Sequence, residues 1–273
     1  MRTAGLALGM LLAVSLARAQ APLVEPGGVV NDGSYAAQGV APGSIIAIFG
    51  TSLLASSFAE GDTLPLSTSL ASINSVTFNG VAAGLFYAIP TQIDAQLPWE
   101  SMPGGTVNIV VRTASGTSAA QTVTVLASVP GIFTVNEKGT GQAIATDNAD
   151  NAFAAPTGSV PGSNAHPFSI STQGQNGHAL IIWCTGLGAV SNQPASGAAS
   201  PGAPNFAETP TNPIVMIGGV KAQVLFSGLA PGFVGENQVD VLLGAGTPTG
   251  NAVPVTVEIN GVTSNQVTVA IGN

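Results

Sequence analysis

The stretch VTFNGVAAGLFYAIPTQIDAQL, residues 76–97, returns in altered form as VMIGGVKAQVLFSGLAPGFVGENQVDVL, residues 215–242. Within it, Gln92-Ile93-Asp94 matches Gln238-Val239-Asp240, 146 positions later. The residues added in the second copy fall at Pro231-Gly232, where a loop can absorb an insertion. A period of this length has the size of a domain and is far longer than a solenoid or propeller repeat. The duplication therefore predicts two homologous domains in tandem.

Short runs of β-forming residues, separated by Gly, Pro, Asn and Ser, recur along both copies, and they predict an all-β fold of two β-sandwiches. Asn79-Gly80 and Asn260-Gly261 each join two such runs and predict type I′ hairpins, whose central residues need positive φ. The expected strands are residues 44–49, 75–78, 82–87, 92–97, 106–112 and 118–126 in the first copy, and 178–184, 214–217, 221–226, 238–242, 253–259 and 264–271 in the second, which begins with a strand near 141–147.

The composition places the boundary between the domains after the first copy. We expect the first sandwich over residues 20–128, a connection over 129–140 and the second sandwich over 141–273. The connection contains Pro130-Gly131, which breaks regular structure. It also contains Ile132-Phe133, whose apolar side chains we expect between the domains.

The first residues indicate export. Residues 1–19 have the form of a cleaved secretory signal, because Arg2 supplies a positive start, residues 4–16 are apolar, and Ala17-Arg18-Ala19 fits the small-x-small cleavage rule. No later apolar run is longer than a strand, so we expect no membrane span. Cys184 is the only cysteine and can form no disulfide within the chain. We expect an extracellular, periplasmic or cell-surface protein.

The charge of the mature chain limits the classes of partner that the protein can bind. Without the signal, Arg112, Lys138 and Lys221 stand against 13 acids, a net charge of −10. Three isolated bases cannot form a patch for a phosphate backbone, which excludes nucleic acid as a partner, and an anionic membrane surface is disfavoured for the same reason. We expect a protein or polysaccharide partner at the cell exterior. Few charged side chains are available to prevent the strand edges from pairing with another copy, so self-association is an alternative.

Three segments repeat in order and carry a family resemblance. They are PGSIIAIFGTSL, VTFNGVAAGLFYA and PGGTVNIVVRTASGTSAAQTVTV in the first copy, and LIIWCTGLG, VMIGGVKAQVLFSG and NAVPVTVEINGVTSNQVTVAI in the second. They resemble the IPT/TIG family of immunoglobulin-like domains. Over residues 29–271 the chain is more similar still to the "Solibacter C-terminal domain" family of secreted bacterial proteins, through VVNDGSYAAQGVAPGSIIAIFGTSL, QIDAQLP, VPGIFT and TGLGAV. The resemblance implies immunoglobulin-like sandwiches and no established activity.

Acidic residues offer two candidate sites. Asp94 and Asp240 occupy matching positions, so a role in each domain's own structure explains them better than a shared acid-base or metal site. The run Asp147-Asn148-Ala149-Asp150-Asn151 places several oxygen atoms in a short loop, as a Ca²⁺ site would, although it lacks the EF-hand pattern. Asp and Asn also favour tight turns, so a hairpin tip is the alternative interpretation. We expect no other cofactor.

The residue types of catalytic sites occur without a catalytic pattern. His166 and His178 are the only histidines, too few for a zinc site, and we expect both on the surface. Cys184 lies on a core strand at the position of Gly50 and is expected to be buried. No G-x-S-x-G elbow is present. These observations favour a protein that is not an enzyme.

Aromatic and apolar residues supply the remaining candidates. Trp99 has no aromatic counterpart in the second copy, which makes it a candidate for ligand binding or for an interface. Ile132, Phe133 and Phe233 are further ligand or interface candidates.

Together the patterns predict a non-enzymatic secreted or cell-surface protein that acts as a binding, adhesive or structural module. A self-assembling subunit of an extracellular fibre or surface layer is one alternative. A secreted carbohydrate-binding or carbohydrate-active accessory protein is another.

Overall fold

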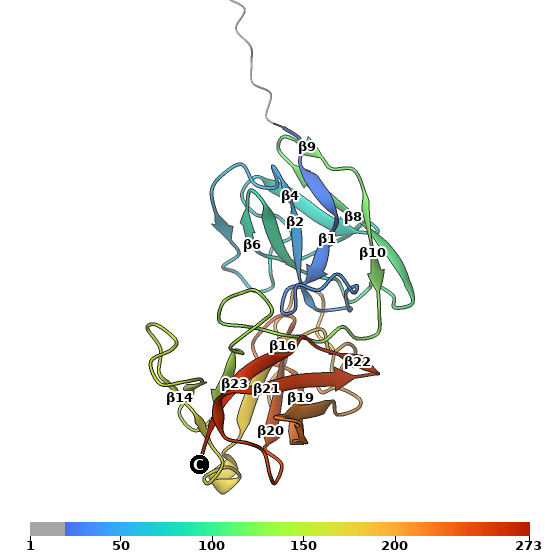
Figure 1. Ribbon diagram of the computed structural model, residues 1–273. Coiled ribbons are helices and arrows are strands. Elements are labelled where there is room, and N and C mark those ends of the chain that lie inside the picture. The colour runs from blue at the N-terminus through green and yellow to red at the C-terminus, as the bar shows by residue number, and fades with distance from the viewer. Residues whose placement is uncertain (1–19) are drawn as a thin grey trace, which may run out of the picture.

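A computed structural model describes residues 20–273, and the expected signal over residues 1–19 lies outside this range. The chain forms two β-rich lobes, one from each half of the sequence, joined end to end (Figure 1). Within residues 20–273 there is no α-helix, only one 3-10 turn, η1 (Gln175–Gly177). None of the helical structure in this range is long and apolar enough to cross a membrane.

The first lobe is a sandwich of two sheets. Neighbouring strands in each sheet are antiparallel, and β9 pairs with β8. One sheet has the order β1 (Leu23–Asn31), β2 (Ile45–Thr51), β7 (Gln92–Gln96), β6 (Leu85–Ile89), β3 (Ala59–Glu60), and the other has β10 (Gln121–Val125), β8 (Gly105–Thr113), β4 (Ile73–Phe78), β5 (Val81–Ala82), with β9 (Gly116–Thr117).

The second lobe repeats this arrangement with a few added short strands. One sheet has the order β14 (Ala165–His166), β13 (Phe153–Ala154), β12 (Ala145–Asp147), β16 (Leu180–Thr185), β20 (Glu236–Leu242), β19 (Gln223–Leu229), with β11 (Gly131–Ile132) beside β16. The other has β15 (Phe168–Ser169), β23 (Val267–Gly272), β21 (Gly250–Ile259), β17 (Ile214–Ile217), β18 (Val220–Lys221), with β22 (Val262–Thr263) beside β21.

Both lobes have the strand order of an immunoglobulin-like sandwich. Taken in chain order as strands A to G, β1-β2-β7-β6 and β12-β16-β20-β19 are both A-B-E-D sheets. The facing sheets β10-β8-β4 and β23-β21-β17 are both G-F-C. The all-β class and the duplicated sandwich predicted from the sequence are confirmed.

The alternation of side chains along the strands explains how each lobe closes. In β7, Ile93 points into the first core, while Gln92 and Asp94 lie on the outer face of the sheet. In β20, Val239 points into the second core, while Gln238 and Asp240 lie outside. Each lobe therefore has its own apolar core, and each presents an outer A-B-E-D face that carries the same Gln-x-Asp pair.

Local details of the two copies agree as closely as their topology. Both hairpins have positive φ at their central residues, 48° and 88° at Asn79-Gly80 and 52° and 77° at Asn260-Gly261, as expected for type I′ turns. A bulge shifts the register between Leu85 and Tyr87 in the first copy and between Val224 and Phe226 in the second. The duplication is thus preserved to the level of single residues.

The first strand of the first lobe is absent from the sequence-based expectation. β1 contains Pro26 and positive-φ Gly27, and its register with β2 shifts between Val24 and Val29. Proline and glycine are strong signals against a strand, yet Pro is tolerated at sheet edges and bulges. β1 is such an edge strand, which is why the local sequence concealed it.

Polar hydrogen bonds join the lobes. Thr185 Oγ1 accepts from the backbone N–H of Ile45 at 2.9 Å and donates to the carbonyl of Gly235 at 2.7 Å. Gln96 Oε1 accepts from the N–H of Gly197 at 2.6 Å. Thr185 and Gln96 are fully buried, so these bonds hold the relative position of the two domains.

Candidate functional site: the cleft between the sandwiches

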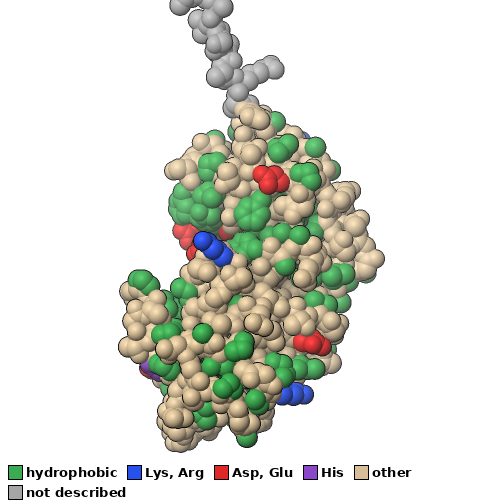
Figure 2. All heavy atoms as spheres, in the orientation of Figure 1, with side chains coloured by type: hydrophobic (Ala, Val, Ile, Leu, Met, Phe, Trp, Pro, Cys, Tyr) green, Lys and Arg blue, Asp and Glu red, His purple; other side chains and the backbone are tan. Residues whose placement is uncertain are grey.

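A cleft of about 770 Å³ lies where the outer A-B-E-D face of the first lobe meets the chain that connects the lobes. Figure 2 shows an indentation between the lobes in which acidic, basic and apolar side chains gather. Four aromatic side chains line the cleft: Tyr35, Phe49 and Tyr87 from the first lobe, and Phe133 from the connection. Tyr35 and Phe49 pack with ring centroids 6.3 Å apart. The cleft therefore offers an apolar, aromatic wall.

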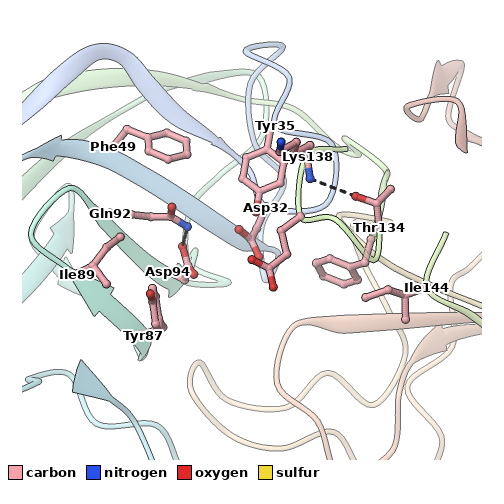
Figure 3. A pocket seen from close by; sticks show the side chains of 12 residues that line it. Asp32, Tyr35, Phe49, Tyr87, Ile89, Gln92, Asp94, Thr134, Lys138 and Ile144 are labelled. Carbon is pink, nitrogen blue, oxygen red and sulfur yellow. Dashed lines mark hydrogen bonds between the residues drawn. The ribbon is translucent and has the colours of Figure 1, made fainter. Parts of the chain in front are cut away.

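Three acids share this space with one base. Asp32 follows β1, Asp94 lies on β7, and Glu137 and Lys138 belong to the connection. Figure 3 shows the Asp32 and Asp94 side chains directed toward the same space, with Gln92 beside Asp94. The Gln92 amide donates to Asp94 Oδ1 at 2.7 Å.

Burial and the charge of neighbouring acids keep Asp32 and Asp94 partly protonated near neutral pH. Burial, followed by the charge of Asp32, raises the pKa of Asp94 to about 7. Burial also raises the pKa of Asp32 to about 6, against the opposing effect of the Tyr35 hydroxyl. The pKa of Tyr35 is raised above its ordinary value by burial and by the neighbouring acids, so this phenol stays neutral. Asp32 Oδ1 is shielded from solvent and has no hydrogen-bond partner.

The turn that carries Asp32 occurs in both lobes. In the first, residues 31–35 form a turn closed by a bond from the N–H of Tyr35 to the carbonyl of Asn31, at 2.8 Å. In the second, the N–H of Asn151 donates to the carbonyl of Asp147, also at 2.8 Å. Tyr35 and Asn151 both have positive φ, 54° and 59°. The run 147–151, proposed above as a Ca²⁺ loop or a hairpin tip, is thus the second copy of the turn at residues 31–35.

The side chains after these equivalent strands have different partners. Asn148 Oδ1 accepts from the N–H of Ala179 at 2.8 Å, and its amide donates to the carbonyl of Gly177. Asp32 is the counterpart of Asn148, because the N–H of Asp32 bonds to Ile45 as that of Asn148 bonds to Ala179. In the first lobe, however, the N–H of Ile45 bonds to Thr185 of the second lobe. The interdomain contact thus takes the donor that Asp32 would otherwise use and leaves its carboxylate facing the cleft.

The equivalent outer face of the second lobe is occupied by its own side chains. Trp183, the counterpart of Phe49, packs against Phe233 with centroids 6.3 Å apart. Phe226, the counterpart of Tyr87, packs edge-on against Phe206 at 5.7 Å. Asp240 accepts from Gln238 through both oxygens, at 3.0 and 3.2 Å. Burial raises the pKa of Asp240, and no neighbouring acid contributes to that shift.

The proposed Ca²⁺ loop gains one residue that the sequence did not indicate. Asp147, Asp150 and His166 place ligand-type atoms within 4.8 Å of one another. His166 Nε2 lies 3.0 Å from Asp150 Oδ2, which lowers the pKa of Asp150 and raises that of His166. Asn148 bonds backbone groups, as does Asp147 Oδ1, which accepts from Ala149. These atoms already have partners, and Asn151 closes the turn through its backbone.

His178 corrects a sequence-based expectation. We expected a surface residue, but His178 is buried, and its ring packs on Phe168 with centroids 4.9 Å apart. Its Nε2 lies 2.6 Å from Asp147 Oδ1, outside the angular range of a hydrogen bond. His178 directly follows η1, and its contact with Phe168, a core residue of the second lobe, buries the ring. The local glycine-rich sequence carries no signal for this contact.

The interface candidates have different positions. The backbone N–H of Trp99 donates to Ser196 Oγ of the second lobe at 2.9 Å, so Trp99 is an interface residue. Ile132 lies on β11 within the core of the second lobe, and Phe133 lines the cleft. Phe233 is half exposed beside Trp183. Cys184 is fully buried, as expected.

Sequence reasoning missed Asp32, Tyr35 and Glu137. For Asp94 the sequence predicts a role within its own domain, and the side-chain hydrogen bond between Gln92 and Asp94 has a counterpart between Gln238 and Asp240 in the second lobe. A signal for Asp32 exists in the alignment of NDGSY (31–35) with DNADN (147–151), which places an acid opposite Asn148. That alignment was hidden because β1 is irregular and the two turns share almost no residue identity.

The side chains of the cleft can bind a ligand and can hold protons. The lining given by residues 20–273 contains no serine, cysteine or histidine. The groups able to transfer a proton there are the acids, Lys138 and the hydroxyls of Tyr35, Tyr87 and Thr134. The arrangement suits recognition of a ligand that stacks on aromatic rings and donates hydrogen bonds to carboxylates.

No protein-family model matches the chain, and no curated protein matches it. Among solved structures, the chain is similar to Bacteroides ovatus SGBP-B of the mixed-linkage glucan utilization locus, solved with a mixed-linkage heptasaccharide, at 12% identity and a TM-score of 0.34; the match covers 92% of this chain and 45% of that chain. It is also similar to domains 5-6 of the S-layer protein SbsC, at 13% identity and a TM-score of 0.25, over 92% of this chain and 98% of that chain. A third match is the N-terminal periplasmic domain of ScsB from Proteus mirabilis, at 12% identity and a TM-score of 0.18, over 84% and 87%. Scores this low carry no functional argument, and the resemblance to the IPT/TIG and Solibacter C-terminal families stays a prediction.

Proposed function

We propose that this protein is an exported, non-enzymatic binding module that holds its ligand in the cleft between its two sandwiches. The observation that carries the proposal is the difference between the two outer faces. The outer aromatics are paired in both lobes, Trp183 with Phe233 and Phe226 with Phe206 in the second, Phe49 with Tyr35 and Tyr87 with Phe58 in the first. In the first lobe Tyr35, Phe49 and Tyr87 also line a cleft of about 770 Å³. Exposed aromatic rings beside a few polar groups are the usual composition of a ligand site.

The interface supports a preformed site. Thr185 and Gln96 bond across the two lobes from buried positions, and Asn265 Nδ2 donates to the carbonyl of Ile132 at 2.9 Å near the cleft wall. A cleft whose walls are held by buried hydrogen bonds loses little conformational entropy when a ligand binds. The acids and the signal-like residues 1–19 agree with a soluble ligand met outside the cytoplasm.

The fibre or surface-layer alternative has less support from the sheet edges. Five of the eight edge strands, β3, β5, β14, β15 and β18, are only two residues long. Of the three longer ones, β1 is interrupted by Pro26 and by a register shift, and β19 by a register shift. Short edges give little backbone for a neighbouring copy to pair with. A binding role therefore accounts for more of the structure.

The test uses two matched variants. Affinity electrophoresis of the mature protein in gels containing xylan, dextran or chitosan would reveal retardation by a polysaccharide ligand. We expect Tyr87→Ala to abolish retardation, because Tyr87 lines the cleft, and Phe226→Ala, its counterpart in the second lobe, to leave it unchanged. Equal loss in both variants would contradict a site in the cleft.

A further inference from the structure

Asp32 is an acid at a position where the fold needs none. Its counterpart Asn148 satisfies the backbone N–H of Ala179, and the corresponding N–H of Ile45 is already satisfied by Thr185. The carboxylate of Asp32 has no role in closing its turn, which Asn31 performs by accepting from the N–H groups of Gly33 and Ser34. An acid released from structural bonding and turned into a cleft is a candidate for ligand binding.

The cleft lacks the positive charge that would neutralise its acids. Asp32, Asp94 and Glu137 face it, and Lys138 is the only base among its lining residues. No salt bridge joins Lys138 to any of these acids within residues 20–273. Asp32 and Asp94 are half-buried, whereas Glu137 is exposed. Half-buried carboxylates that lie close together are destabilising unless a cation or a proton compensates them. The acids therefore favour a ligand that brings positive charge.

The shape of the surroundings favours an organic cation over a metal ion. The only group of three His, Cys, Asp or Glu side chains within residues 20–273 that is compact enough to hold a metal lies elsewhere, at Asp147, Asp150 and His166. The cleft instead surrounds its acids with the rings of Tyr35, Phe49, Tyr87 and Phe133. Aromatic faces attract ammonium groups and also cover the carbon chain attached to them.

The unpaired oxygen of Asp32 further limits which organic cations fit the cleft. Asp32 Oδ1 is shielded from solvent and accepts no hydrogen bond. A primary ammonium group has three N–H donors and can satisfy that oxygen, whereas a quaternary ammonium has none. We propose that the cleft binds a primary ammonium group on an apolar or sugar-like stem, with Asp32 and Asp94 as its carboxylate partners and the aromatic rings around the stem. This inference rests on the cleft being the ligand site.

The test compares amines that differ in one property. Cadaverine carries primary ammonium groups on an aliphatic stem, glucosamine carries one on a sugar, choline has the charge without N–H donors, and N-acetylglucosamine has the sugar without the charge. Titration calorimetry at pH 8 should show binding of cadaverine or glucosamine, with choline and N-acetylglucosamine weaker by about tenfold or more. The preferred amine identifies the stem, because an aliphatic chain and a sugar ring are compared directly.

Matched variants separate the site from general attraction to an acidic protein. Asp32→Asn and Asp94→Asn should each weaken amine binding by about tenfold or more, since each removes a charged acceptor. Asp240→Asn removes the same charge from the equivalent position in the second lobe and should leave binding unchanged. Equal weakening by Asp240→Asn would overturn the proposal. The melting temperatures of all three variants show whether each remains folded.

The pH dependence gives a second readout. The titratable groups that face the site are Asp32 and Tyr35 after β1, Tyr87 on β6, Asp94 on β7, and Glu137 and Lys138 of the connection. Since the pKa values of Asp32 and Asp94 are about 6 and about 7, binding of cadaverine should strengthen as pH rises from 5 to 8, while its aliphatic ammonium groups and Tyr35 stay protonated. Binding that is independent of pH over this range would count against these two carboxylates as partners.

The outcome also separates this inference from the proposed function. If no amine binds, but polysaccharide retardation persists and is lost in Tyr87→Ala, the cleft is a ligand site and the ammonium assignment is wrong. If neither amines nor polysaccharides bind and Tyr87→Ala changes nothing, both proposals are wrong.

Discussion

The turn after the first strand occurs once in each lobe, and the two copies have nearly the same backbone and different surroundings. At residues 147–151 the turn lies within its own domain, and Asn148 bonds the chain beside it. At residues 31–35 the turn lies against the second lobe, and Thr185 takes the backbone donor that the side chain of Asp32 would use. Docking of the two domains has thus changed a structural position into one that faces a cleft.

The outer A-B-E-D faces of the two lobes also differ in the residues that surround a shared hydrogen bond. Gln92-Asp94 and Gln238-Asp240 keep the same hydrogen bond, so this pair belongs to the immunoglobulin-like unit. Only the first pair has a second acid beside it, and only that pair is surrounded by rings contributed from the turn and the connection. A duplicated scaffold can thus acquire an acidic, aromatic cleft where one copy contacts its neighbour.

Removal of Asn31 should break the first turn and give the largest loss of stability. The Asn31 side chain is fully buried, accepts from Gly33 and Ser34, and donates to the carbonyl of Val129 across the domain boundary at 2.8 Å. Asn31→Ala leaves these groups without partners, and we expect a loss of about 3 kcal/mol in the free energy of unfolding. Urea denaturation of the mature protein measures it.

A second variant in the same turn serves as the control. Ser34 Oγ accepts from Ala36 over a long 3.3 Å contact, so Ser34→Ala should cost less than about 0.5 kcal/mol. If Asn31→Ala costs no more than Ser34→Ala, the Asn31 bonds do not hold the two lobes together.

Thr185 tests whether interdomain docking controls Asp32. Thr185→Val keeps the shape of the side chain but leaves the N–H of Ile45 and the carbonyl of Gly235 unpaired, at a cost of about 2 kcal/mol. Once Thr185 is replaced, Asp32 can accept from the N–H of Ile45, as Asn148 accepts from that of Ala179, and Asp32→Ala removes this replacement acceptor. We therefore expect the double variant to lose about 1 kcal/mol more than the sum of the two single variants.

The double-mutant cycle needs all four proteins under one condition. Chemical denaturation at pH 5 is suitable, because Asp32 is then mostly protonated and its charge does not dominate the comparison. Strictly additive effects of the two substitutions would show that the turn does not adopt the bonding of its counterpart, and the comparison between the turns would fail.

The scaffold was accessible from sequence because its signals are local or repeated. The Asn-Gly turns, the alternating strands and the repeated Gln-x-Asp pair each predict structure from a few neighbouring residues. The cleft was not accessible, because Asp32 and Asp94 meet only when β1, β2 and β7 pair within the first lobe, and Glu137 joins them from the connection. His178 was misjudged for the same reason, since its burial depends on Phe168 and Asp147.

The paired acids of the cleft should make the protein less stable as pH rises. The pKa values of Asp32 and Asp94, about 6 and about 7, lie above the ordinary value of 3.8, so the folded state binds more protons than the unfolded state between pH 4 and pH 7. Stability contributed by these protons is present at the lower pH and is lost through this window. We expect Asp32→Asn to be more stable than the native protein at pH 8 by about 1 to 2 kcal/mol and nearly equal to it at pH 4.

Urea denaturation at unit steps from pH 4 to pH 8 measures this difference. Glu236, whose pKa is raised to about 7 by burial, titrates in the same window, but it is common to both proteins and cancels in the difference. Asp240→Asn should show a smaller effect than Asp32→Asn, because no second acid acts on Asp240. If the difference in the free energy of unfolding between Asp32→Asn and the native protein did not change with pH, the pKa of Asp32 would not be raised in the folded protein.

The turn at residues 147–151 should respond least, because its side chains are already bonded within the protein. Asp150 pairs with His166 at an exposed position, where such pairs contribute less than about 0.5 kcal/mol, and Asp147 bonds Ala149. We expect Asp150→Asn to leave stability nearly unchanged. We also expect about 5 mM CaCl₂, a concentration above the dissociation constants typical of extracellular calcium sites, to leave the melting temperature unchanged. A calcium-dependent rise in melting temperature that Asp150→Asn abolishes would instead make this turn a metal site. The two turns would then both have departed from a structural role, each toward a different cation.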